Sequence, residues 1–248
     1  MGPNIRVLIR SVSFIFCLVA TAAPASSALA TTASDAATTP PVIVIGFVGG
    51  FVRRDATVHS AVQVAEHLRH DYPVGVQTEI FENHHREDAR AEIFRLLDTN
   101  HDGRLSSEEK QNARIILYGH SWGASEAITL ARELGGDGIP VLLTIQVDSV
   151  AKSFENDKVI PANVAAAANF YQSNGFVHGE PQIIAADPNR TQILGNFRFD
   201  YKTNPIECQQ YPWYDRVFMK FHTEIECDPK VWNQVGSLIR SRLPQQPR

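Results

Sequence analysis

The chain has 248 residues, of which 44% are hydrophobic and 20% are charged, and its formal net charge is -4. This is the composition of an ordinary globular protein, with enough apolar side chains for one large core. The negative charge gives no reason to expect nucleic acid or an anionic membrane as a partner.

The first thirty residues have the pattern of a secretory leader. Arg6 and Arg10 precede a largely apolar stretch at residues 12–20, and small residues then end in Ala28-Leu29-Ala30. This pattern predicts a signal peptide over residues 1–30. The apolar stretch is too short to cross a bilayer as a stable helix. We therefore expect a secreted or periplasmic protein with no stable membrane anchor after leader cleavage.

Residues 31–41 are small and polar and predict a flexible tether, and one domain follows over residues 42–248. Runs without polar alternation predict strands buried on both faces, and apolar residues at helical spacing predict helices. In chain order we expect a strand at 42–45, a helix at 58–68, a strand at 76–81, a helix at 88–97, a strand at 115–118, a helix at 122–134, strands at 141–147, 168–172 and 191–197, and a helix at 231–239. The alternation predicts an α/β fold, with a mostly parallel central sheet and helices on both faces.

Residues 98–109 match an EF-hand calcium loop at every diagnostic position. Oxygen-bearing side chains stand at the first, third and fifth positions, glycine at the sixth, and glutamate at the twelfth. The predicted calcium ligands are Asp98, Asn100, Asp102, the carbonyl of Arg104, and Glu109. The loop lies in the connection that leads to the strand at 115–118, so we expect the calcium to be structural. A polar loop that never binds metal is the alternative.

A G-x-S-x-G motif, Gly119-His120-Ser121-Trp122-Gly123, lies where the strand at 115–118 ends and the helix at 122–134 begins. A sharp strand-to-helix turn lifts the central side chain above the sheet. The two glycines lack the Cβ atoms that would collide there. Backbone N–H groups at the start of the helix point toward developing negative charge. The motif therefore favours Ser121 as a nucleophile.

With this motif at the end of a buried strand, residues 42–240 resemble the α/β-hydrolase superfamily, in particular its uncharacterised secreted bacterial members of esterase or lipase type. The resemblance implies a serine hydrolase that cleaves an ester or thioester bond in a small-molecule or lipid-like substrate. It also implies an oxyanion hole formed by the backbone N–H of Trp122 and that of Phe47 or Val48, within the turn expected at residues 46–50.

The superfamily's chain order of serine, acid and histidine implies the rest of a triad. His222 has the position of the base, and His178, the other histidine beyond Ser121, is a candidate for substrate contact. Asp148 directly follows the strand at 141–147 and is our candidate acid. Asp187 is the alternative.

Cleavage of the leader removes Cys17 and leaves Cys208 and Cys227. An oxidising compartment favours a disulfide between them, and two separate buried thiols are the alternative.

Two other functions remain open. One is a calcium-dependent binding module on a hydrolase scaffold with no turnover, because a fold does not fix a function. The other is a peptidase or acyltransferase, which the same triad permits.

Overall fold

The computed structural model describes residues 40–153 and 155–245. The predicted signal peptide and residues 31–39 of the predicted tether lie outside the described residues. The strands are β1 (Val42–Val48), β2 (Val76–Glu82), β3 (Ile115–His120), β4 (Leu143–Val147), β5 (Val159–Ile160), β6 (Ala166–Gln172), β7 (Ile184–Ala185) and β8 (Gln192–Phe199). The helices are α1 (Ser60–Asp71), α2 (Arg86–Leu97), α3 (Ser107–Gln111), α4 (Trp122–Gly136), α5 (Trp213–Phe218), α6 (Lys220–Cys227) and α7 (Pro229–Arg240).

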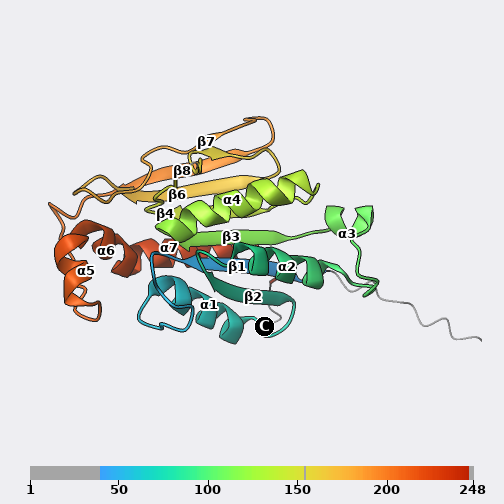
Figure 1. Cartoon of the computed structure of the whole chain (residues 1–248), viewed down its shortest axis with the longest axis horizontal. Helices are drawn as coiled ribbons and strands as arrows, with labels where there is room; N and C mark the ends of the chain where they lie inside the picture. Colours follow the sequence, from blue (N-terminus) through green and yellow to red (C-terminus); the bar gives the residue numbers. More distant parts are fainter. Residues whose placement is uncertain (1–39, 154, 246–248) are drawn as a thin grey trace, which may run out of the picture. The chain divides into compact units, whose positions relative to one another are not determined.

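The main sheet has six strands in the order β2-β1-β3-β4-β6-β8, and every neighbouring pair is parallel (Figure 1). Parallel neighbours need crossover connections, and helices supply most of them. The expected α/β class with a mostly parallel sheet is confirmed. The strands β5 and β7 form a separate two-stranded sheet.

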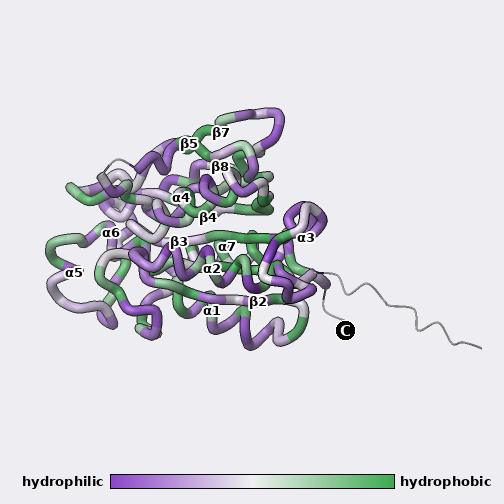
Figure 2. Tube along the Cα trace, turned by 45° about the vertical axis from the view of Figure 1, so that its right-hand side comes forward, coloured by the Kyte–Doolittle hydropathy of each residue, from purple (hydrophilic) through white to green (hydrophobic). Residues whose placement is uncertain are grey.

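Two apolar cores cover the two faces of the sheet. Successive strand residues point to opposite faces, so Ile116 and Tyr118 of β3 pack with α1 and α7, whereas Ile115 and Leu117 pack with α2 and α4. Figure 2 shows the apolar residues concentrated along the central strands. The strands are therefore buried on both faces, as their unbroken apolar runs predict.

Several predicted boundaries are wrong by a few residues. Strand β1 continues to Val48, so residues 46–48 of the expected turn at residues 46–50 belong to the strand. The helices α5 and α6 were not predicted, because they are short and α5 exposes most of its apolar residues. Across the described residues, no helix has the length and apolar composition to cross a membrane.

Candidate active site

Ser121 lies in the turn between β3 and α4, at the carboxyl-terminal edge of the sheet. Its backbone has a φ of 57° and a ψ of -127°, a combination that residues with a Cβ rarely adopt. The neighbouring strand maintains this strain, because Ser121 N donates to the Val147 carbonyl of β4 at 3.0 Å. The turn thus has the local geometry that the motif predicts.

Gly119 and Gly123 make the turn sterically feasible. A Cβ on Gly119 would collide with the Gly123 carbonyl group, and a Cβ on Gly123 would lie 2.5 Å from the Phe47 carbonyl oxygen. Both obstacles are backbone atoms, which cannot rotate away as the end of a side chain can. The two glycines of the motif are therefore required by packing.

Asp148 follows β4 directly and is completely buried. Its Oδ1 accepts hydrogen bonds from the backbone N–H groups of Gly179 at 2.7 Å and Gln172 at 3.1 Å. Its Oδ2 accepts one from Gln172 Nε2 at 2.8 Å. These donors hold the carboxylate in one orientation.

The structure brings His222 to this carboxylate, with 2.6 Å between His222 Nδ1 and Asp148 Oδ2. His222 lies in the first turn of α6, and its side chain is 6% exposed. Asp148 therefore orients the imidazole through Nδ1. The other ring nitrogen, His222 Nε2, does not take part in the contact with Asp148. Ser121 makes no side-chain hydrogen bond within the described part of the chain, but it shares a cavity with His222.

The alternative residues lie elsewhere. Asp187 follows the small strand β7, and its Oδ1 accepts from the Asn189 backbone at 2.9 Å. His178 is exposed, and its Nδ1 lies 3.2 Å from the carbonyl oxygen of Gly179. Neither residue lines the cavity that contains Ser121.

The predicted oxyanion-hole residues are only partly at the site. Trp122 is the first residue of α4 and lines the cavity. Phe47 and Val48 are buried inside β1 and do not line it, and their role as backbone donors stays a prediction. They do not line the cavity because β1 runs longer than its apolar pattern predicts. The turn residues that line the cavity are Gly49 and Gly50.

The cavity around Ser121 has a volume of about 640 Å³. Its polar lining residues are Arg53, His59, His120, Ser121, Asp215, His222, Thr223 and Glu226. The rest of its lining is Gly49, Gly50, Phe51, Val52, Ala56, Trp122, Val150, Val177, Pro212, Tyr214 and Met219. A largely apolar wall with a few convergent polar groups is typical of small-molecule sites.

The cavity contains a second histidine–carboxylate pair, which the sequence did not predict. His59 Nδ1 lies 2.6 Å from Glu226 Oε1, although the two residues are 167 positions apart in the chain. The other Glu226 oxygen lies 3.6 Å from His120 Nδ1. The one available signal was the spacing of His222 and Glu226, which places them on one face of a helix.

Burial and charge set the protonation of this cluster. Burial lowers the pKa of His120 to about 4, so His120 is neutral at neutral pH, and its contact with Glu226 is not an ion pair there. For Glu226, burial alone would raise the pKa, but the pKa is lowered, first by the positive charge of His120 at pH values where it is protonated, and then by the hydrogen bond from His59. Glu226 is therefore a buried carboxylate that stays ionised among histidines.

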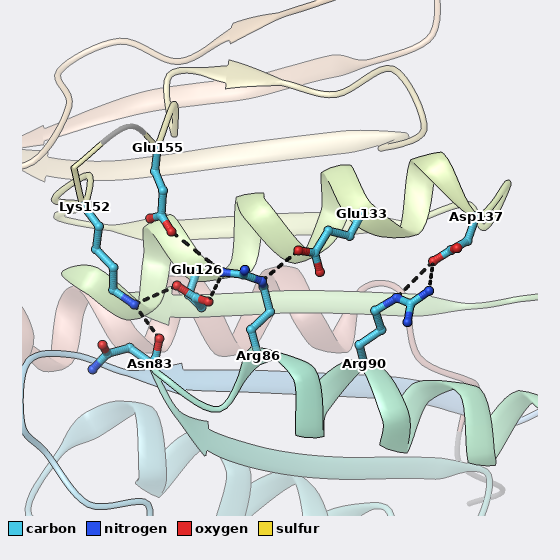
Figure 3. Close-up of polar contacts among 8 residues, drawn as sticks. All are labelled: Asn83, Arg86, Arg90, Glu126, Glu133, Asp137, Lys152 and Glu155. Carbon is cyan, nitrogen blue, oxygen red and sulfur yellow. Dashed lines mark hydrogen bonds and ion pairs between the residues drawn. The ribbon is translucent and has the colours of Figure 1, made fainter.

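A separate charged network holds α4 in place (Figure 3). Glu126, 2% exposed and one turn into α4, contacts Arg86 of α2 and accepts from Lys152 Nζ at 2.8 Å. Lys152 Nζ also donates to the Asn83 carbonyl at 2.5 Å, and Arg86 Nε donates to Glu133 at 2.9 Å. This network links the helix that begins after Ser121 to α2 and to the loop after β4.

The predicted calcium loop has EF-hand features in its backbone. Gly103 has a φ of 78°, and Asp98 accepts from the backbone N–H groups of Asp102 and Gly103. The side chain of Glu109, however, caps α3, since it accepts from Ser106 and from Thr99. The hydrogen bonds from Ser106 have the largest effect, and with those from Thr99 they lower the pKa of Glu109 to about 2.

The acidic side chains of this loop do not converge on one point. Across residues 40–153 and 155–245, no three His, Cys, Asp or Glu side chains are grouped so that they could hold a metal ion. Calcium binding by Asp98, Asn100, Asp102, Arg104 and Glu109 stays a prediction. The loop lies before β3 and Ser121 lies after it, so the two are at opposite ends of that strand (Figure 1).

The predicted disulfide is present between Cys208 and Cys227. Cys227 is the last residue of α6, and Cys208 lies in the loop before α5. The bond therefore closes the segment that carries His222.

No protein-family model matches the chain, and no curated protein matches it. Solved structures give weak likenesses. An α/β serine hydrolase without a lid from Xanthomonas campestris is 13% identical with a TM-score of 0.36, over 86% of this chain and 87% of that one. The RedJ thioesterase of the prodiginine pathway in Streptomyces coelicolor is 12% identical with a TM-score of 0.35, over 74% and 90%. An acetyl xylan esterase is 11% identical with a TM-score of 0.37, over 82% and 99%. Likenesses at these values assign neither a family nor an activity to this chain.

Proposed function

We propose that this protein is a serine hydrolase of the α/β-hydrolase type, which cleaves an ester or thioester bond through Ser121, His222 and Asp148. The observation that carries the proposal is the 2.6 Å contact of His222 with the buried Asp148, in the cavity that also contains the strained Ser121. A nucleophile, an imidazole and an orienting carboxylate are the three groups that this chemistry needs.

In the first half of the reaction, Ser121 Oγ attacks the carbonyl carbon of the substrate, and His222 Nε2 accepts the hydroxyl proton. The resulting oxyanion accepts hydrogen bonds from the backbone N–H of Trp122 and from the turn that contains Gly49 and Gly50. His222 then gives its proton to the leaving alkoxide or thiolate as the carbon–oxygen or carbon–sulfur bond breaks. An acyl group remains on Ser121.

In the second half, water attacks the acyl carbon while His222 takes a proton from it. The bond to Ser121 Oγ breaks, and His222 returns the proton to that oxygen. Asp148 stays ionised and stabilises the imidazolium in both halves.

The lining of the cavity favours a small-molecule or lipid-like ester. Phe51, Tyr214 and Met219 offer apolar contact to an acyl chain, and the volume of about 640 Å³ suits a ligand of that size. The largely apolar lining favours such a substrate over the polar backbone of a peptidase's polypeptide substrate.

A fluorophosphonate probe tests the proposal directly. Wild-type protein should be labelled and should hydrolyse a chain-length series of p-nitrophenyl esters, whereas Ser121→Ala should lose the label and at least about a thousandfold in kcat. A scaffold that binds without turnover would show neither labelling nor hydrolysis in the wild type. Full activity in purified Ser121→Ala would remove Ser121 as the nucleophile.

Secretion or a periplasmic location is part of the proposal, and the leader pattern in residues 1–30 and the disulfide support it. The structural calcium site is a further part, and the full loop motif supports it. Calcium that binds only the folded chain should raise the melting temperature by several degrees at a large excess over its Kd. Calorimetry of wild type and Glu109→Gln with and without calcium tests this, and no binding at millimolar calcium would contradict it.

A further inference from the structure

The cavity contains two histidine–carboxylate pairs with the same geometry. In each pair the imidazole Nδ1 lies 2.6 Å from a carboxylate oxygen, His222 with Asp148 and His59 with Glu226. All four side chains are at most 11% exposed. The proposed mechanism uses only the first pair and leaves the second without a role.

The two pairs are physically connected. Glu226 follows His222 by four residues on α6, so the two side chains project from the same face of the helix. His120 lies against both residues, with its Nδ1 3.6 Å from Glu226 Oε2 and its ring centroid 4.5 Å from that of His222. His222 therefore contacts Asp148 directly and lies beside His120, which in turn contacts Glu226.

The charge state of the cluster makes Glu226 an anion near His222. An Nδ1–H of His59 donates a hydrogen bond to this carboxylate. His120 does not compete for a proton, since burial keeps it neutral.

The ionisable groups around His222 come from several elements. They are Asp148 after β4, His120 in β3, His59 before α1, Asp215 in α5, and Glu226 in α6. Lys220 extends from α6 to a side-chain exposure of 54%. Of these groups, Asp148 contacts His222 directly and Glu226 contacts His120, whose ring lies against His222. Permanent cations in this part of the molecule include Arg53, which lines the cavity, and Lys220.

We propose that Glu226 is a positioning residue of the active site, which holds His59 and His120 and supplies a second negative charge that favours protonated His222. The proposal rests on the proposed role of His222 as the base. In the reaction, protonated His222 forms as Ser121 attacks, so a carboxylate that stabilises it lowers the barrier. The rival explanation is that the His59–Glu226 contact only ties the loop before α1 to α6.

The test is the pH dependence of kcat/KM for a short p-nitrophenyl ester, in wild type, Glu226→Gln and the control Glu224→Gln. The low-pH limb of this profile reports protonation of the base in the free enzyme. Loss of a nearby negative charge makes protonated His222 less favourable, so the limb should move to lower pH by about one unit in Glu226→Gln. Glu224 is on the same helix, is also buried and does not line the cavity, so its variant should keep the wild-type limb.

A purely structural tie would lower activity without moving the limb, and an unmoved limb in folded Glu226→Gln overturns the inference. If Glu226→Gln does not fold by circular dichroism, Glu226→Met removes the same charge with an apolar side chain that buried sites tolerate, and its limb decides instead. The parent proposal is judged separately. Full activity in Ser121→Ala means that it fails, whereas an inactive Ser121→Ala with an unmoved limb means that only the Glu226 inference fails.

Discussion

Two clusters of buried carboxylates lie on the elements that flank Ser121, one on α4 and one around α6, and they differ in their partners. On α4, Glu126 contacts Arg86 and Lys152. Around α6, Asp148 and Glu226 contact histidines. Guanidinium and ammonium groups stay protonated at any physiological pH, whereas an imidazole gains and loses its proton near neutrality.

The difference in partner separates two uses of a buried carboxylate. The network of Glu126 is permanently charged and can only hold elements together. The histidine cluster can accept a proton from a nucleophile and return it. The type of partner, rather than the burial of the acid, separates the cluster that only ties elements together from the one that we propose carries the chemistry.

The largest expected effect is on activity. Asp148→Asn should lower kcat by about ten thousandfold, because an amide no longer selects the tautomer of His222 or stabilises its imidazolium. Steady-state ester hydrolysis measures this. The matched variant Asp187→Asn should stay within about twofold of wild type, and the reverse order of losses would move the acid to Asp187.

The next effect is on the free energy of unfolding, and we expect it from the cluster around Glu126. Glu126→Gln leaves Arg86 and Lys152 without their shared carboxylate, so the free energy of unfolding should fall by about 2–3 kcal/mol in urea titration. The folded variant should hydrolyse esters at close to the wild-type rate. Glu133→Gln removes a more exposed partner of the same arginine and should cost less than about 1 kcal/mol. A large activity loss in folded Glu126→Gln would contradict the distinction between a structural cluster and a catalytic one.

The third effect is the pH dependence of stability that His120 causes. The pKa of His120 is about 4 in the folded chain, against 6.5 for an unperturbed histidine, so the unfolded chain binds a proton that the folded chain does not. The stability from neutral His120 is complete above pH 6.5 and is lost as the pH falls toward 4, by on the order of 3 kcal/mol.

The substitution of His120 measures how much of this pH dependence of stability comes from its imidazole. His120→Phe keeps a ring against His222 but cannot titrate, so the fall in unfolding free energy between pH 6.5 and pH 4 should be shallower than in wild type. Equal slopes in the two proteins would place the acid sensitivity elsewhere.

The fold was largely readable from the sequence, because strands buried on both faces need unbroken apolar runs and few other segments have them. The turn at Ser121 was readable for a similar local reason, since both glycines and the flanking strand are adjacent in the chain. Strand β1 shows the limit of this reasoning. The glycine at the start of its last three residues, Gly46 to Val48, predicts a turn, but parallel pairing with β2 and β3 continues through them.

The contacts between distant residues could not be read from the sequence. The approach of His59 to Glu226 depends on how α1 and α6 pack against the sheet, and no local pattern encodes that. The choice between Asp148 and Asp187 depends on sheet membership. Strand β4 lies in the main sheet beside β3, whereas β7 pairs only with β5, so Asp187 is not at the edge where Ser121 lies.

The disulfide makes the segment from Cys208 to Cys227 a covalent ring, and His222 is inside it. The helix α5, also in the ring, exposes Trp213 and Phe218 and contributes Tyr214 to the cavity wall. In an open chain, detachment of such a weakly buried helix could spread along the backbone into α6. A closed ring limits how far its members can separate, whichever contacts are broken. The disulfide therefore limits how far a local detachment of α5 can carry the imidazole of His222 away from Asp148.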